Sequence, residues 1–276
     1  MDITTVRHWR TARSRADLTL AAGETFLAGG SWLMSEPQPE VTGFVDLTSL
    51  GWDDLDASAE GLRIGATCTI ARLVAGAQRL RDTHPHWTAL PMVADAANAL
   101  LASFKIWNTA TVGGNICRAF SAGAMVSLAA ALDGVAEVWT PAGADRRVPV
   151  ADLVTGNGST VLARGEALRA VFLPAAALRS QARLRKIALA EHGRSGAVVT
   201  GRIDPDGGAV FTVTAATEVP AVFRFAALPD AEELSAAVAS APHFFTDPLG
   251  AADWRRGVSI VLAERIRRDL ITAARR

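Results

Sequence analysis

The chain has 276 residues, of which 50% are hydrophobic and 20% charged, so disorder is excluded and one large or two ordinary domains are expected. Lysine and arginine together number 28, as do aspartate and glutamate, which leaves no net charge to attract nucleic acid. No segment reaches the roughly 18 apolar residues of a membrane span. The N-terminal residues lack the apolar core of a signal peptide, so we expect a cytoplasmic protein.

Residues 1–56 have the pattern of a small unit that mixes a helix with strands. Ser14 can cap a short helix over 14–22. Strands are expected at 25–28 and 44–47, where apolar residues gather in short runs. The first of these strands leads directly into a glycine pair at 29–30.

Residues 57–176 alternate strand-like and helix-like segments. Strands are expected at 62–66, 135–140, 146–148 and 167–173, and helices at 69–80, 88–103 and 122–132. Thr69 can cap the first of these helices. The helix over 122–132 is small and apolar on most faces, which predicts full burial. A turn at Pro141-Ala142-Gly143 separates two of the strands.

The pattern changes near residue 176 to consecutive strands followed by helices. Strands are expected at 182–190, 197–203 and 209–215, with a hairpin turn at Asp206-Gly207, and helices at 230–240 and 247–274. The last helix is basic, and we expect a solvated face that carries Arg255, Arg256, Arg265, Arg267, Arg268, Arg275 and Arg276. We therefore expect a domain of residues 1–176, with subdomains of about 1–56 and 57–176, and a C-terminal domain of residues 177–276.

The chain contains two cysteines, Cys68 and Cys117. An iron–sulfur cluster usually takes four thiolates, so this chain cannot hold one alone. Two free, buried thiols are favoured over a disulfide between them, because cytosolic thiols stay reduced. His84 and His86 have no cysteine or carboxylate at metal-site spacing, so we expect exposed imidazoles and no metal site.

Two glycine runs carry the strongest functional signal: Leu27-Ala28-Gly29-Gly30-Ser31 and Ala110-Thr111-Val112-Gly113-Gly114-Asn115. A glycine pair lets backbone N–H groups approach an anion with no Cβ in the way, and consecutive N–H groups form a concave anion site. Neither run matches the Rossmann or P-loop pattern. Two such loops predict a clamp on the two phosphates of one dinucleotide.

These motifs resemble the FAD-binding (medium) subunit of the molybdenum hydroxylase family, which includes the carbon monoxide dehydrogenase medium subunit and the xanthine dehydrogenase FAD domain. The first run, followed by Leu33, resembles the family's AGG(T/S)xL loop, and the second resembles AT(I/V)GGN(L/I). Gly65-Ala66-Thr67, Gly165-Glu166-Ala167-Leu168 and Leu184-Arg185-Lys186 resemble further family segments in the same order. The resemblance covers nearly the whole chain.

The resemblance implies an α+β fold, with a two-subdomain FAD-binding lobe of the vanillyl-alcohol-oxidase/PCMH type and a C-terminal sheet-and-helix domain. It implies an oxidoreductase subunit that passes electrons through FAD to an acceptor. The partners would be a large subunit with a molybdenum cofactor and a small subunit with [2Fe–2S] clusters, in a heterotrimer or its dimer. No catalytic residue is expected in this chain.

Position by position, the resemblance implies that FAD contacts both loops and a few outlying residues. The expected contacts are Leu27, Ala28, Gly29, Gly30, Ser31, Trp32, Leu33, Leu101, Ala110, Thr111, Val112, Gly113, Gly114, Asn115, Ala124, Leu168 and Lys186. A cation at Lys186 near the pyrimidine edge of the flavin would favour the anionic reduced form. The alternative for Lys186 is a surface lysine.

The chain departs from the family at two positions. Ala124 stands where relatives usually carry an acidic residue, and Trp32 stands where they often have aspartate or a small residue. Two alternatives stay open. One is a stand-alone flavin oxidoreductase of the same fold, although the chain has no tyrosine and no convincing acid or base. The other is a scaffold subunit that has lost FAD, which Ala124 suggests.

Overall fold

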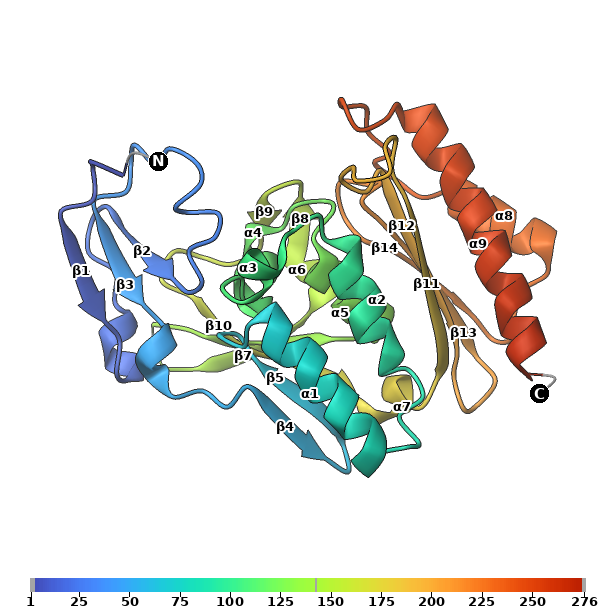
Figure 1. Cartoon of the computed structure of the whole chain (residues 1–276), viewed down its shortest axis with the longest axis horizontal. Coiled ribbons are helices and arrows are strands. Elements are labelled where there is room, and N and C mark those ends of the chain that lie inside the picture. Colours follow the sequence, from blue (N-terminus) through green and yellow to red (C-terminus); the bar gives the residue numbers. More distant parts are fainter. Residues whose placement is uncertain (1–2, 142, 275–276) are drawn as a thin grey trace.

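The computed structural model describes residues 3–141 and 143–274. Ala142 of the expected turn, and Arg275 and Arg276 of the basic helix, lie outside the described residues, as do Met1 and Asp2. Three main sheets follow one another along the longest dimension of the molecule, and the chain builds them in order from N-terminus to C-terminus (Figure 1). Within the described ranges, no helix combines the length and apolarity that crossing a membrane requires.

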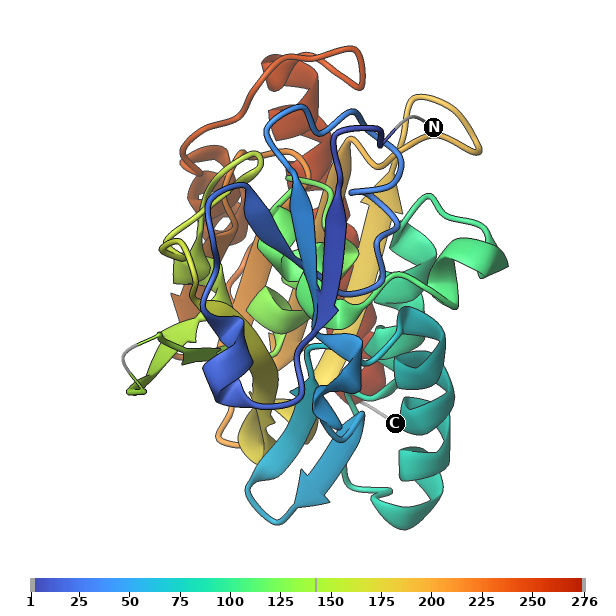
Figure 2. The ribbon, with the colours of Figure 1, turned by 90° about the vertical axis from the view of Figure 1, so that its left-hand side faces the viewer.

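The first sheet is small and parallel. Its strands, in spatial order, are β1 (His8–Thr11), β3 (Gly43–Asp46) and β2 (Glu24–Leu27). The helix expected over 14–22 is only a 3-10 turn, η1 (Arg15–Leu18). The guanidinium of Arg10 binds the carbonyl oxygens of Asp17 and Thr19, which a continuing helix would need for its own hydrogen bonds. Figure 2 shows this sheet in front of the rest of the molecule.

The second sheet is antiparallel and lies in the middle of the molecule (Figure 1). Its strands, in spatial order, are β4 (Leu55–Ser58), β5 (Gly61–Gly65), β10 (Ala167–Pro174), β6 (Val135–Trp139) and β7 (Asp145–Pro149). The same stretch of chain forms the turn η2 (Thr48–Leu50), the helices α1 (Ile70–Thr83), α2 (Pro91–Ala99), α3 (Phe104–Trp107), α4 (Val112–Arg118), α5 (Ala124–Ala131), α6 (Val150–Leu153) and α7 (Ala175–Leu178), and the hairpin of β8 (Val154–Gly156) and β9 (Ser159–Thr160). The largest apolar core of the protein lies between this sheet and α1, α2 and α5.

The helix expected over 88–103 is shorter than its apolar spacing predicts. α2 ends at Ala99, and Leu100 has extended backbone angles, with φ −76° and ψ 122°. The hydroxyl of Ser195 donates to the carbonyl oxygen of Ala99, and the ammonium of Lys186 donates to that of Asn98. These contacts from a distant part of the chain occupy the carbonyl groups that a longer helix would use.

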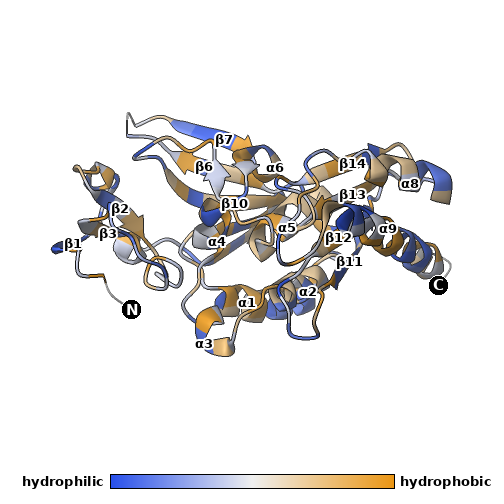
Figure 3. Cartoon of the chain, turned by 90° about the horizontal axis from the view of Figure 1, so that it is seen from above, coloured by the Kyte–Doolittle hydropathy of each residue, from blue (hydrophilic) through white to orange (hydrophobic). Residues whose placement is uncertain are grey.

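The third sheet is an antiparallel meander of β11 (Gln181–Ile187), β12 (Ala197–Ile203), β13 (Ala209–Thr214) and β14 (Ala221–Phe225). It is followed by α8 (Ala231–Ala239) and α9 (Ala252–Ala274). α5 packs on one face of the sheet, against β12 and β13, and α9 packs on the other face, against β11 and β12 (Figure 3). β12 and β13 are buried on both faces, which explains why their residues are apolar or small almost without alternation. The predicted hairpin at Asp206-Gly207 joins them.

Arg255 corrects the expectation of a solvated arginine face on the last helix. Its side chain is buried. Its guanidinium donates to the carbonyl oxygens of Gly250, Gly196 and Ala215 and pairs with the carboxylate of Asp247. Arg255 thus ties the start of α9 to the ends of β12 and β13 rather than facing solvent.

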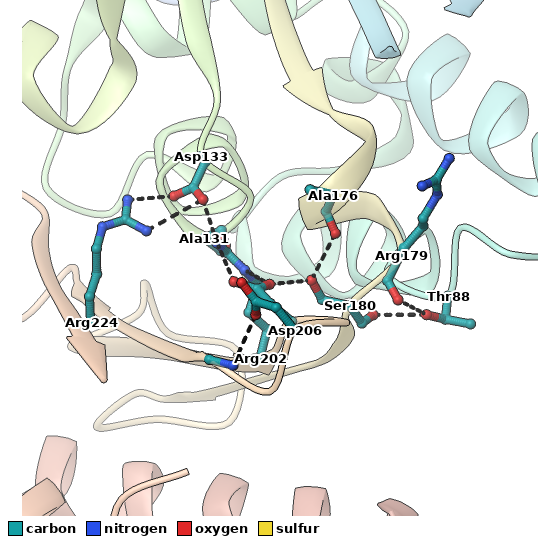
Figure 4. Close-up of polar contacts among 11 residues, drawn as sticks. Thr88, Ala131, Asp133, Ala176, Arg179, Ser180, Arg202, Asp206 and Arg224 are labelled. Atoms are coloured by element: carbon teal, nitrogen blue, oxygen red, sulfur yellow. Dashed lines mark hydrogen bonds and ion pairs between the residues drawn. The ribbon is translucent and has the colours of Figure 1, made fainter. Parts of the chain in front are cut away.

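A second buried arginine, Arg202 on β12, joins the third sheet to the end of α5 (Figure 4). Its guanidinium donates to the carbonyl oxygen of Ala131 and pairs with the carboxylates of Asp133 and, at 2.7 Å, Asp204. The side chain of Arg202 is only 2% exposed, whereas Arg224, which also pairs with Asp133, is 60% exposed. Removal of a buried partner leaves uncompensated charge, so Arg202 is the member on which the junction depends.

We expect Arg202→Met to lower the free energy of unfolding by about 3 kcal/mol or more, because two carboxylates lose a buried partner. Arg224→Met is the matched control, and its effect should stay below about 1 kcal/mol because that pair is exposed. Urea unfolding at neutral pH measures both values. Equal losses in the two variants would contradict the assignment of the junction to Arg202.

Candidate functional site

A cavity of about 430 Å³ opens between the first sheet and the second. Its wall combines both glycine loops with the start of β10 and a few neighbouring side chains. The lining residues are Thr25, Phe26, Ala28, Gly29, Gly30, Ser31, Trp32, Leu33, Leu47, Ala66, Thr67, Ala110, Thr111, Gly113, Gly114, Asn115, Cys117, Arg118, Phe120, Leu162, Glu166, Ala167 and Leu168. The structure therefore brings together the two glycine loops, which are about eighty residues apart in the sequence.

The first glycine loop presents a row of unused backbone donors. Within the described part of the chain, the N–H groups of residues 29–33 donate to no protein acceptor. Gly30 has φ +66°, a conformation that glycine adopts without strain. A Cβ on Gly29 would lie 1.8 Å from the carbonyl oxygen of Thr109, so this glycine also allows the two loops to touch. Successive free N–H groups in a concave turn suit an anion.

The second glycine loop has already used its backbone donors. The N–H of Val112 donates to the carbonyl oxygen of Cys68, that of Gly113 to the carbonyl oxygen of Ala66, and that of Gly114 to the hydroxyl of Thr111, all at 2.9–3.0 Å. The two loops are therefore not equivalent. The first loop supplies free N–H donors, whereas the second forms part of the cavity wall with its N–H groups already bonded.

Gly113 and Gly114 have different reasons to be glycine. A Cβ on Gly113 would lie 2.5 Å from the Cβ of Ala66, so this residue is required by packing against the end of β5. A Cβ on Gly114 would meet only the hydroxyl of Thr111, at 2.8 Å, and Gly114 is exposed on the cavity wall. A side chain at Gly114 would therefore press on the hydroxyl that caps α4, and its open side faces the cavity.

Five of the expected contact residues do not line the cavity. Leu27, Val112 and Ala124 are buried beneath its wall. Leu101 is 55% exposed on the segment before α3, which projects from the body of the molecule (Figure 2). Lys186 is exposed on β11, where its Nζ donates to the carbonyl oxygen of Asn98 at 2.8 Å. The role of these five residues stays a prediction.

Asn115 holds the start of α5 near the cavity. Its side-chain oxygen accepts a hydrogen bond from the N–H of Met125 at 2.9 Å. Ala124, which replaces the acidic residue expected from the family pattern, is buried at the first position of that helix. The N-cap residue of α5, Gly123, has no side chain, and the side-chain oxygen of Asn115 satisfies one of the free N–H groups at the start of this helix instead.

Sequence reasoning missed Arg118 and Phe120, which lie one turn beyond the second loop. The guanidinium of Arg118 lies over the rings of Trp32, at 3.8 Å, and Phe120, at 4.0 Å. Burial lowers the pKa of Arg118 from its ordinary value. The sequence signal that could have indicated them is an arginine and an aromatic residue shortly after the second glycine loop, together with the unusual Trp32 directly after the first.

Cys68 and Cys117 are both free thiols, as expected. Cys68 is buried, and burial raises the pKa of its thiol to about 12. Cys117 is exposed and lines the cavity, which corrects the expectation that both thiols are buried.

A cavity lined by free backbone donors, between two sheets of an α+β fold, is suited to an anionic cofactor or ligand. Residues 8–176 match the family described as the FAD binding domain in molybdopterin dehydrogenase, and the chain belongs to that family. This result confirms the resemblance and the FAD-binding class. A comparison with curated protein sequences finds no match.

Several solved structures share the fold. Quinoline 2-oxidoreductase from Pseudomonas putida 86 matches with a TM-score of 0.79 at 20% identity, over 97% of this chain and 96% of that chain. Carbon monoxide dehydrogenase from Oligotropha carboxidovorans matches with a TM-score of 0.78 at 21% identity, over 93% and 94%. The carbon monoxide dehydrogenase from Hydrogenophaga pseudoflava that lacks the Mo-pyranopterin moiety matches with 0.78 at 19%, over 94% and 95%. The expected α+β fold is confirmed.

The residues present fit FAD. The free N–H groups of the first loop suit its diphosphate, and Gly114 leaves room for close approach at the second loop. Leu33, Leu47 and Leu168 supply apolar wall. The Nε of Arg118 is buried and has no hydrogen-bond partner within the described residues.

Glu24 anchors the strand that carries the first loop. Its side chain is 3% exposed and accepts hydrogen bonds from Arg10 Nε and from the N–H of Ala21, both at 2.8 Å, and it contacts His8 at 3.2 Å. The hydrogen bond from Arg10 lowers the pKa of Glu24 to about 2. The carboxylate therefore stays ionised in the folded protein well below the pH at which an unfolded glutamate gains a proton.

A folded-state pKa below the unfolded value stabilises the protein above the unfolded pKa, near 4.3, and this stabilisation is lost as the pH falls toward about 2. We expect Glu24→Gln to reduce the free energy of unfolding at pH 7 and to make it fall less steeply between pH 5 and pH 3. Urea unfolding at several pH values measures the slope. Glu40→Gln, at an exposed position in the same unit, is the control, and identical slopes in wild type and Glu24→Gln would refute the anchoring role.

Proposed function

We propose that the chain is the FAD-binding electron-transfer subunit of a molybdenum-containing hydroxylase or dehydrogenase. In this proposal a large partner subunit carries the molybdenum cofactor and selects the substrate. A small partner subunit carries the [2Fe–2S] clusters, and the three chains form a heterotrimer or its dimer. Family membership supports the cofactor, and the named structural relatives support the class of complex.

The observation that carries the proposal is the row of free N–H groups at residues 29–33, opposite Gly114. A diphosphate needs several donors in a small space, and backbone N–H groups supply them without a movable side chain. The N–H groups of the first loop would hold the phosphates, and Gly114 would admit them close to the second loop. FAD, when bound, supplies the redox chemistry that links one-electron and two-electron partners.

Leu101 and Lys186 belong to this proposal as contacts of the flavin end of the cofactor. Both lie outside the cavity, where the end of α2 meets β11. Lys186 is exposed. Its ammonium would therefore offer a positive charge to the flavin end of the cofactor without a change in the main chain. The proposed division at residue 176 would then place the flavin between the two domains.

The cavity favours electron transfer over substrate chemistry in this chain. Among its described lining residues, Glu166 is the one carboxylate. Glu166 pairs with Arg146 at 2.6 Å and accepts a hydrogen bond from the N–H of Ala163. The hydrogen bond from Arg146 lowers the pKa of Glu166, so the carboxylate stays ionised and engaged. A stand-alone oxidoreductase would need a proton donor or acceptor that is free to act on substrate.

We expect Gly114→Val to weaken FAD binding by about 10- to 100-fold, because a side chain would enter the space that the cofactor needs. The matched control is Gly257→Val, at an exposed glycine of α9 with nothing near its Cβ position. Flavin absorbance of the purified chains and titration of apoprotein with FAD measure the effect. Full flavin content in Gly114→Val would refute the role of the second loop.

Purification of the native complex from its source tests the remaining part of the proposal. We expect two further chains, one of which carries iron and acid-labile sulfide and the other molybdenum. A flavin-loaded chain without partners would favour the stand-alone oxidoreductase. Partners around a wild-type chain that binds no flavin would favour the scaffold.

A further inference from the structure

Arg118 lines the cavity, although it is not among the cofactor contacts that the family resemblance implies. It is the last residue of α4, and the carbon of its guanidinium lies 3.8 Å from the ring centroid of Trp32, which follows the first glycine loop, and 4.0 Å from that of Phe120. The rings of Trp32 and Phe120 have centroids 6.3 Å apart and lie nearly perpendicular to each other. All three side chains line the cavity. These contacts therefore hold a positive charge in the wall beside the free N–H groups.

The charge on Arg118 lacks a counter-ion within the part of the chain that the structure describes. No carboxylate lies within ion-pair distance, and the buried Nε has no hydrogen-bond partner. Burial lowers the pKa of Arg118, and the charge of Glu36 offsets only part of that effect. The two buried arginines, Arg202 and Arg255, have both carboxylate and carbonyl partners. Arg118 is thus a half-buried, partly desolvated cation without a partner among the described residues.

We propose that Arg118 is a diphosphate-binding residue that makes this cavity selective for a dinucleotide flavin over flavins with one phosphate or none. The inference rests on the proposed function, because it assigns a residue to the same cofactor site. A guanidinium has five N–H donors in its plane, which remain available when an aromatic ring contacts one of its faces. Trp32 and Phe120 restrict the Arg118 side chain from two directions, and its N–H donors complete the set of N–H groups at residues 29–33.

The contact with Arg118 also accounts for Trp32, which departs from the family pattern. An aromatic face attracts a guanidinium and partly compensates for its loss of water. A small residue at position 32 would leave Arg118 mobile, and the ordering of its side chain would then oppose ligand binding. Trp32 is therefore a positioning residue, and Arg118 is the residue that contacts the ligand.

The test compares wild type, Arg118→Met and Arg118→Lys as full-length apoproteins titrated with FAD, ADP, FMN and riboflavin. We expect Arg118→Met to weaken binding of FAD and ADP by about 10- to 100-fold, the effect of one charge-assisted hydrogen bond. Riboflavin binding should change by less than about twofold, and FMN binding should change less than FAD binding. Arg118→Lys should restore part of the affinity for FAD and ADP, because it returns the charge without the planar fork.

Stability of the apoprotein provides a readout that does not depend on the cofactor. Because Arg118 is a half-buried charge without a partner among the described residues, we expect Arg118→Met to melt at the same temperature as wild type or higher. Arg268→Met, at an arginine on the far domain that is 74% exposed, is the control, and it should leave all four affinities unchanged. A ligand-independent loss of the fold would appear as a lower melting temperature and as weaker riboflavin binding.

The outcomes separate the inference from the proposed function. Equal affinity for FAD in wild type and Arg118→Met would overturn the inference and leave the proposed function intact. Tighter FAD binding in Arg118→Met would overturn it too, since the Arg118 side chain would then occupy space that the cofactor needs. A wild-type chain that binds no FAD would overturn the proposed function itself.

Discussion

The site depends on the direct contact between two glycine loops. Gly29 cannot carry a side chain, because its Cβ would lie 1.8 Å from the carbonyl oxygen of Thr109, and Gly113 packs in the same way on Ala66. These two contacts bring the ends of β2 and β5 and the start of α4 to one point. The small first sheet, which has only a small core of its own, is thereby held against the middle of the molecule, and the cavity is the space left between them.

In the C-terminal part of the chain, two buried arginines join separate elements, as the glycine contacts join the two loops at the cavity. Arg202 joins β12 to the end of α5, and Arg255 joins α9 to the ends of β12 and β13. Each guanidinium donates to backbone carbonyl oxygens of neighbouring elements. Each is also paired with aspartate, so the charge is compensated where it is desolvated. Arg118 is only half-buried, but within the described residues it lacks that compensation, and this difference is the reason that we propose a ligand-binding role for Arg118 and a structural role for the other two.

Local patterns predicted a large part of the fold. The side chain of Thr69 caps α1 by accepting from the N–H of Arg72, α5 is wholly buried, and Asp206-Gly207 turns between β12 and β13, as expected. The short strands β1, β4 and β14, each at the edge of its sheet, were missed, although the Val and Phe residues of β14 favour a strand. Helix ends moved where side chains from distant segments bind the last carbonyl groups, as at Ala99.

The sequence by itself determined the family, the cofactor class and the two loops, because these reside in short motifs whose chemistry needs no knowledge of neighbours. It could not determine which loop donates hydrogen bonds. The donors of Gly113 and Gly114 are used by Ala66 and Thr111, whereas those of residues 29–33 remain free. It also could not place Arg118, because a guanidinium acquires its role from the rings that cover it, and the ring of Trp32 comes from a segment 86 residues earlier in the chain. Only tertiary structure decides which donors are already satisfied and which charges are left without a partner.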